Sequence, residues 1–144
     1  MQVSQILKSK AAAGVITVAP DQSVAEIAEL LSARKIGAVI VSTDGRKVEG
    51  ILSERDIVRE LGRRGAICLQ DRGRDIMTPR PVSCSLGDTS DDVFAKMTDG
   101  RFRHMPVVEN GELLGLISIG DVVKARLAEL HMEKSALEGM IMGH

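Results

Sequence analysis

The sequence predicts an α+β protein built from two β-α-β-β-α repeats that pack on each other through their sheets. The first observation is a short pattern written twice, as GILSERD at 50–56 and as GLISIGD at 115–121. The second is that the preceding segments also correspond, since VITVAPDQS at 15–23 aligns with VSCSLGDTS at 82–90. Self-similarity over most of the chain indicates an internal duplication.

The duplication divides the chain into a first repeat over residues 1–67 and a second repeat, with a C-terminal helix, over residues 68–144. AVIV at 38–41 aligns with MPVV at 105–108, which gives an offset of 67. A repeat of roughly 60 residues does not bury much surface alone. We therefore expect the two sheets to pack together.

Each repeat is expected to begin with a short helix, VSQILK in the first copy, and a short strand, VITV. Ser23, followed by Glu26, then forms a capping box for a longer helix. The offset of 67 places Ser90 on Ser23 in the second copy. One face of the first longer helix is apolar and must cover a sheet; it carries Val24, Ile27, Ala28 and Leu31.

Two strands and a second helix complete each repeat. The dipeptides Asp44-Gly45 and Asn110-Gly111 lie between apolar runs, which is the strongest local indication of a β-hairpin. Ser53 and Ser118 end the second strand of each hairpin, and the helices DIVRELG and DVVKARL follow them.

The last helix is unusually long, at residues 122–142. Apolar residues recur along it at spacings of four and three, interrupted once by a lysine: Val123, Leu127, Leu130, Lys134, Leu137 and Ile141. This is the spacing of a helix that packs against another helix. Either the first half packs on its own sheet and the rest frays, or this helix and the short N-terminal helix pack against a second subunit.

The composition excludes several classes of protein. A net charge of −1 leaves no overall field to hold nucleic acid or an anionic membrane, and two Phe without Tyr or Trp leave no stacking platform for bases. No apolar run approaches the ~20 residues that span a bilayer, and the N-terminus lacks the core of a signal peptide. Cys68 and Cys84 form no framework of closely spaced bridges. We expect a cytoplasmic protein.

The repeated Gly-x-x-Ser-x-x-Asp pattern allows two interpretations. Ser followed by Asp is an ordinary helix cap. A cap alone does not require Gly50 and Gly115, which weaken a strand and often mark the close approach of a ligand. In a nucleotide site, the Gly would leave room for a flat base and the carboxylate would accept both hydroxyls of a ribose. The repetition favours the nucleotide.

GILSERD, GLISIGD and RHMPVV together resemble tandem CBS domains, the Bateman module. The resemblance covers essentially the whole chain, and the stretch from 100 to 124 is particularly similar to stand-alone CBS-pair proteins of bacteria and plant organelles. It implies a module without catalytic activity that binds adenosine-containing ligands between its repeats. It also implies a homodimer.

The resemblance further implies two nucleotide sites, made of three sets of residues. The first set would bind ribose and phosphate: Ser53 with Asp56, and Ser118 with Asp121. The second would contact the adenine through its main chain: Thr17 and Val18, and Cys84 and Ser85. The third would form apolar walls: Ala38, Val39 and Ile40, and Met105, Pro106 and Val107.

The repeats differ in their basic residues. Arg103 and His104 resemble the pair that meets phosphates in the family. At the aligned positions the first repeat has an Ile-Gly pair ending at Gly37, so Lys35 and Arg55 are the nearest substitutes. We therefore expect two unlike sites, with weaker phosphate recognition in the first repeat.

Catalysis is the competing class of function. Cys84 and His104 could form a nucleophile and its base, but the sequence offers no third group to orient them. Asp91 and Asp92 fall at the start of a helix, where they complement its dipole. Three His and two Cys lack the spacing of a structural metal site. We expect neither an enzyme nor a metal protein.

The sequence thus predicts a small sensor that binds AMP, ADP, ATP, NAD(H) or S-adenosylmethionine and alters its contact with an unidentified partner protein. AMP and NADH cannot be ranked, since both present an adenosine with a ribose diol and a 5′ phosphate. The alternative is an interaction scaffold in which nucleotide only completes the fold.

Overall fold

The computed structural model describes residues 1–10 and 15–142. A four-stranded sheet has the order β1 (Thr17–Val18), β2 (Ala38–Val41), β3 (Gly50–Ser53) and β4 (Thr78–Pro79). Its first pair is parallel and the other two pairs are antiparallel. The second sheet is the antiparallel pair β5 (His104–Glu109) and β6 (Glu112–Ser118), extended by a parallel bridge from Cys84 to Val107.

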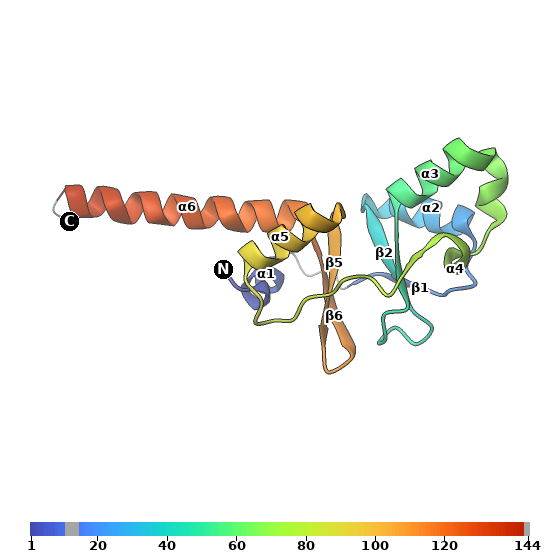
Figure 1. Ribbon diagram of the computed structural model, residues 1–144, viewed down its shortest axis with the longest axis horizontal. Coiled ribbons are helices and arrows are strands. Elements are labelled where there is room, and N and C mark those ends of the chain that lie inside the picture. Colours follow the sequence, from blue (N-terminus) through green and yellow to red (C-terminus); the bar gives the residue numbers. More distant parts are fainter. Residues whose placement is uncertain (11–14, 143–144) are drawn as a thin grey trace.

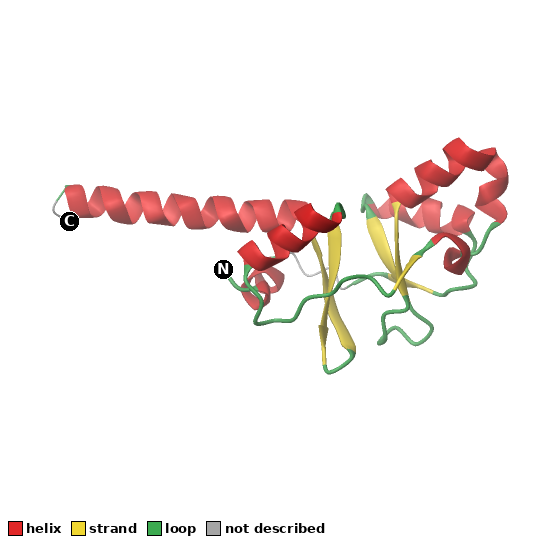
Figure 2. Cartoon of the chain, viewed as in Figure 1, coloured by secondary structure: helices red, strands yellow, loops and turns green. Residues whose placement is uncertain are grey.

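The helices lie outside these sheets. They are α1 (Val3–Ser9), α2 (Val24–Arg34), α3 (Glu54–Arg64), the 3₁₀ helix η1 (Gly65–Gln70), α4 (Gly73–Ile76), α5 (Ser90–Gly100) and α6 (Ile119–Ile141). The two sheets face each other in the middle of the molecule, with α2 and α3 outside one and α5 and α6 outside the other (Figures 1 and 2). The predicted α+β fold, with a short first helix and a long last one, is confirmed.

Both predicted hairpins are present. Asn110 and Gly111 have φ of 52° and 78°, so β5 and β6 are joined by the tight left-handed turn that this dipeptide favours. Gly45, with φ of 75°, lies in the longer loop between β2 and β3. The two hairpin tips also meet, because Leu113 N donates to Arg46 O at 2.8 Å.

The offset between the repeats is 66 over the first half of each unit, so the predicted offset of 67 was wrong by one residue. The helix caps are Ser23 and Thr89, and each accepts a hydrogen bond from the third helical N–H. Ala38 pairs with Ser53 as His104 pairs with Ser118. Because Thr also caps a helix, Thr89 replaces the predicted Ser90. His104 therefore corresponds to Ala38, and the first repeat still lacks the basic pair.

The leading helices of the two repeats are exchanged. In α1, Val3 and Ile6 pack in the core of the second repeat, whereas Ile76 of α4 packs in the core of the first. Matching backbone hydrogen bonds fix both helices, from Val3 N to Asp88 O and from Gly73 N to Gln22 O, each 2.8 Å long. Each core therefore contains a helix from the other repeat's sequence. The predicted boundary between residues 67 and 68 stays a prediction.

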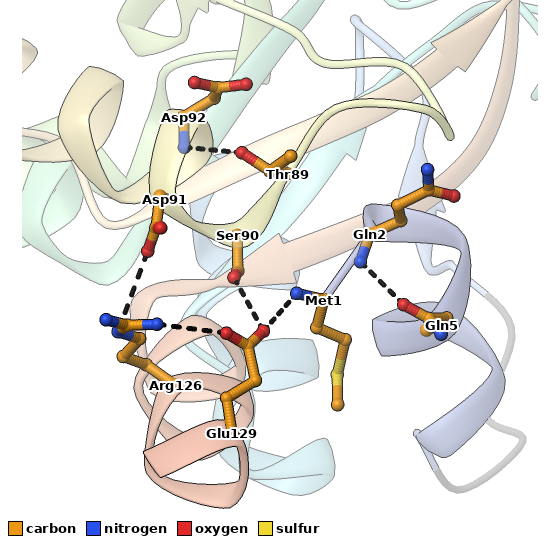
Figure 3. Close-up of polar contacts among 9 residues, drawn as sticks. All are labelled: Met1, Gln2, Gln5, Thr89, Ser90, Asp91, Asp92, Arg126 and Glu129. Carbon is orange, nitrogen blue, oxygen red and sulfur yellow. Dashed lines mark hydrogen bonds and ion pairs between the residues drawn. The ribbon is translucent and has the colours of Figure 1, made fainter. Parts of the chain in front are cut away.

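A polar cluster ties the start of the chain to α5 and α6 (Figure 3). The carboxylate of Glu129 pairs with the amino group of Met1 and accepts a hydrogen bond of 3.3 Å from Ser90 Oγ. Arg126 Nη1 lies 3.1 Å from Glu129 Oε2, and Arg126 Nε lies 3.8 Å from Asp91 Oδ1. These contacts involve the first part of α6.

Beyond that part, α6 exposes its apolar face. Its buried residues are Val122 and Ala125, both near the start, while Leu130 is 45% exposed and Leu137 58% exposed. The helix extends well past the body of the molecule (Figure 1). Among residues 1–10 and 15–142, no helix is long and apolar enough to cross a membrane.

The strand glycines of the repeated motif accommodate side chains of the leading helices. A Cβ on Gly115 would lie 2.7 Å from Leu7 Cδ2, and a Cβ on Gly50 would lie 2.4 Å from Met77 Sδ. At Gly50 the space expected for a base is taken by Met77, whereas Gly115 contacts Leu7 and also lines a cavity between the repeats. The glycines instead allow the exchanged segments to approach the sheets.

Gly50→Ala is expected to lower the free energy of unfolding by about 1–3 kcal/mol, as overpacking does. The added Cβ would also lie 2.9 Å from the carbonyl oxygen of Thr78, and the backbone there cannot move as freely as a side chain. Gly62→Ala is the matched control, because a Cβ on Gly62 meets nothing within 4 Å. That change in α3 should stabilise by about 0.5–1 kcal/mol. Urea denaturation followed by circular dichroism measures both; equal midpoints would contradict the packing argument.

Candidate functional site

A cavity of about 590 Å³ lies between the two repeats. Residues from both repeats line it: Leu7, Lys10, Val15, Ile16, Lys35, Ile36, Gly37, Ala38, His104, Leu114, Gly115, Leu116 and Ser118. The lining is largely aliphatic and also carries three basic side chains and one hydroxyl group, from Lys10, Lys35, His104 and Ser118. A smaller cavity of about 490 Å³ between α2 and α3 shares residues 35–37 with the first.

Ser118 and Asp121 form the start of α6 beside the large cavity. Ser118 N donates to Asp121 Oδ2 at 2.9 Å, and Asp121 N donates to Ser118 Oγ at 3.1 Å. The side chain of Asp121 also pairs with Lys10, whose Nζ lies 2.8 Å from Asp121 Oδ2. The same residues thus cap a helix and hold a carboxylate next to the cavity, so the cap and the nucleotide interpretation are compatible.

The carboxyl group of Asp121 is kept ionised by its neighbours. Burial raises the pKa of Asp121. The hydrogen bonds from Lys10 and Ser118 and the positive charge of Lys10 lower it by a larger amount, so the pKa lies below its ordinary value. An ionised carboxylate is the form that accepts two ribose hydroxyls.

The equivalent pair in the first repeat has different surroundings. Ser53 N donates to Asp56 Oδ2 at 2.8 Å, as in the second repeat. The basic partner of Asp56 is local, because Arg59 lies one turn along α3 with its Nη2 2.7 Å from Asp56 Oδ1. Neither Ser53 nor Asp56 lines the large cavity. The two motifs therefore have the same cap and different environments.

His104 begins β5 and reaches across to the first repeat. A Cβ on Gly37 would lie 3.2 Å from His104 Cε1 and 3.6 Å from Glu54 Oε1. Gly37 thus leaves room for the imidazole. Burial lowers the pKa of His104, and the negative charge of Glu54 opposes this only in part, so the pKa is below its ordinary value of 6.5.

This lowered pKa predicts a pH dependence of stability. As pH falls from 7 through 6.5, the unfolded chain binds a proton at this position before the folded chain does, so the free energy of unfolding decreases. His104→Gln should reduce that decrease between pH 7.5 and 5.5, whereas His131→Gln on exposed α6 should not. Urea denaturation at several pH values measures the slopes; the same slope in His104→Gln and wild type would contradict the assignment.

The predicted site residues fall into three groups. Five line the large cavity: Lys35, Gly37, Ala38, His104 and Ser118. Others are buried in or beside the strands: Val18, Val39, Ile40, Cys84, Met105, Pro106 and Val107. The third group lies outside the lining of the cavity; in it, Thr17, Ser53, Ser85 and Asp121 are half-buried and Asp56 is buried. Arg55 and Arg103 are exposed and also lie outside the lining.

Several lining residues were not predicted. Lys10 and Leu7 come from the exchanged first helix and its end, and Leu114 and Leu116 flank the predicted Gly115 in the middle of β6. A residue from a short amphipathic helix carries no local signal of a ligand site. Only the motif match of VSQILK to GRDIMT suggested that this segment belongs to the repeat.

The alternative of a Cys-His nucleophile finds no support in the geometry. Cys84 is buried, its Sγ lies 3.8 Å from Pro106 O, and burial raises its pKa to about 11. The group is therefore a protonated thiol at neutral pH, which is a poor nucleophile. Within the part of the chain that is described, which excludes His144, no three His, Cys, Asp or Glu side chains are grouped to hold a metal.

Comparison with known proteins gives one consistent family. A family model described as CBS domain matches the chain twice, over residues 3–63 and 74–128. The chain is 30% identical to a mitochondrial CBS domain-containing protein of Arabidopsis thaliana, over 98% of this chain and 72% of that protein. It spans only 23% of a longer CBS domain-containing protein of the same plant, at 28% identity.

Solved structures agree with this comparison. A CBS-domain containing protein of Agrobacterium tumefaciens is 49% identical, with a TM-score of 0.82 over 88% of this chain and 99% of that one. A CBS domain protein of Pyrobaculum aerophilum, complexed with AMP, is 25% identical, with a TM-score of 0.77 over 92% of this chain and 99% of that one.

Proposed function

Because this chain belongs to the CBS-domain family, we propose that it is a non-catalytic regulatory module that binds an adenosine-containing nucleotide in the cavity between its repeats. The observation that carries the proposal is the position of the second Ser-x-x-Asp motif. Ser118 lines a cavity built by both repeats, and Asp121, an ionised carboxylate, lies directly behind it.

The chemistry of the walls suits the parts of a nucleotide. The aliphatic side chains of Val15, Ile16 and Ile36 would cover the faces of the adenine. Asp121 and Ser118 would bind the ribose hydroxyls, since a carboxylate accepts two hydrogen bonds and a hydroxyl can donate or accept. The basic groups of the cavity would then face the phosphate.

A second, unlike site would use the first repeat's motif. Ser53 and Asp56 would bind the ribose there, with the main chain near Cys84 and Ser85 against the adenine. Support for this site is weaker, because Ser53 does not line the large cavity, whereas Ser118 does.

The physiological ligand is proposed as one of AMP, ADP, ATP, NAD(H) or S-adenosylmethionine, without a metal. The AMP complex of the Pyrobaculum aerophilum relative supports an adenine nucleotide. A nucleotide can act as a signal only if it binds one arrangement of the protein better than another. The output would be a changed contact with an unidentified regulated protein in the cytoplasm.

A homodimer is the proposed assembly. The exposed apolar residues of α6 recur at the spacing of a helix-helix seam: Val123, Leu127, Leu130, Leu137 and Ile141. Packing two copies along α6 would cover them.

Isothermal calorimetry on ligand-free protein with AMP, ATP, NADH and S-adenosylmethionine tests the proposal. Calorimetry is suitable because a chain without Trp or Tyr has almost no intrinsic fluorescence. Failure of all four compounds to bind folded protein would refute nucleotide recognition. A second measurement distinguishes the sensor from the scaffold alternative. In a scaffold, nucleotide raises the melting temperature but leaves the affinity for a captured partner protein unchanged, whereas in a sensor that affinity changes.

A further inference from the structure

The charges around the large cavity are unevenly distributed. Lys10, Lys35 and His104 line it, and within the described residues no Asp or Glu belongs to the lining. Two carboxylates lie close to the lining: Asp121, which is held by Lys10 and by the start of α6, and Glu54, whose Oε1 would lie 3.6 Å from a Cβ on Gly37. The charged side chains of the lining are therefore basic, which suits a ligand with negative charge.

Lys10 is held by two oxygen atoms of the second repeat. Its Nζ lies 2.8 Å from Asp121 Oδ2 and donates to Leu116 O at 2.8 Å. An ammonium group has three donors, so these contacts leave one for a further acceptor. The side chain is 37% exposed, and its flexible four-carbon chain allows the ammonium to move over several ångströms.

We propose that Lys10 selects for a 5′ phosphate, by moving from Asp121 to the ligand. This inference rests on the proposed function. Once the ribose hydroxyls take the carboxylate of Asp121, Lys10 loses its partner and needs another anionic one in the same cavity. A phosphate supplies it, whereas neutral adenosine does not, and the sulfonium of S-adenosylmethionine adds a positive charge. AMP is therefore favoured over both at this site.

Lys10 fits this role better than the other basic groups. Arg103 is exposed and lies outside the lining of the cavity. His104 is largely neutral at pH 7, because burial lowers its pKa. Lys35 lines the cavity, but it is an exposed residue at the left-handed end of α2, and among the described residues it forms no ion pair that ligand binding would break.

The test is calorimetry with AMP, adenosine and S-adenosylmethionine on wild type, Lys10→Met, Lys10→Arg and Lys8→Met. Wild type should bind AMP at least roughly tenfold more tightly than adenosine or S-adenosylmethionine, as a charge-assisted hydrogen bond allows. Lys10→Met should remove that preference while adenosine binds as tightly as before, or more tightly. Lys10→Arg should keep most of it. Lys8→Met, an exposed residue of the same helix outside the cavity, should behave as wild type.

The outcomes separate this inference from the proposed function. Equal affinities of wild type for AMP and adenosine, or equal losses of both in Lys10→Met, would overturn the role of Lys10 while nucleotide binding stands. Tighter binding of S-adenosylmethionine than of AMP would also overturn it. If no adenosine compound binds wild type, the proposed function and the role of Lys10 both fail. Thermal unfolding by circular dichroism shows whether each variant is folded. If Lys10→Met does not fold, the preference for AMP over adenosine is compared between wild type and Lys10→Arg instead.

Discussion

Asp121→Asn is expected to weaken AMP binding roughly 10- to 100-fold, because hydrogen bonds to a charged group contribute about 1.5–3 kcal/mol. The ionised carboxylate of Asp121 is the acceptor proposed for the ribose hydroxyls. Asn keeps an oxygen that can accept the hydrogen bond from Ser118 N, so the cap of α6 is retained. The loss should therefore appear in the dissociation constant measured by calorimetry, with little change in melting temperature.

Asp56→Asn is the matched control for this experiment. The two residues occupy equivalent positions at the starts of α3 and α6, and both hold the backbone N–H of the preceding cap residue. The motif of Asp56 does not reach the large cavity, because Ser53 is not part of the lining whereas Ser118 is, so replacing Asp56 should leave nucleotide binding in that cavity unchanged. Equal losses in both variants would show that the cavity between the repeats is not the tighter nucleotide site.

Leu130→Lys is expected to convert a dimer into a monomer. Leu130 lies on the exposed face of α6. Burying a leucine contributes about 1.5–3 kcal/mol to the free energy of association, and a symmetric dimer buries this leucine from both chains. Light scattering should then give the mass of one 15.5-kDa chain for the variant and twice that mass for wild type. Because Leu130 is 45% exposed in one chain, the fold itself should change little.

Ser135→Lys provides the control on the same helix. Ser135 follows Lys134 and faces away from the seam of apolar residues, so a lysine there should leave the dimer intact. A wild-type protein that remains a monomer at every concentration tested would end the proposal that α6 pairs with α6 of a second copy.

The features set by neighbouring residues could be predicted from the sequence. Asn110-Gly111 predicted the hairpin because its left-handed φ values suit that dipeptide. Ser23 with Glu26 predicted the start of α2, where Glu26 N donates to Ser23 Oγ at 3.2 Å. The duplication could also be predicted, but its exact register could not. The Asp-x-Ser pattern at 21–23 matches the one at 88–90, which favoured the alignment of Ser23 with Ser90 over its alignment with the cap residue Thr89.

The features that depend on contacts between distant residues could not be predicted. Lys10 and Asp121 are 111 positions apart, and no periodicity links a lysine after a short helix to a carboxylate in the other repeat. The strand glycines were interpreted as space for a ligand because glycine shows only that something comes close. Which group comes close, Leu7 at Gly115 and Met77 at Gly50, depends on the exchange of α1 and α4.

The exchange of the leading helices has a consequence for how the chain folds. The hydrogen bond from Val3 to Asp88 joins residues 85 positions apart, and the core that holds α1 extends to Ala125, so α1 cannot complete its packing until most of the second repeat has been synthesised. The first core in turn needs α4, which follows the first repeat's own last helix. Contacts of this range slow folding, because the entropy of closing the loop is lost before the contact forms. Each half of the duplication thus lacks one helix of its own core and completes the core of the other half.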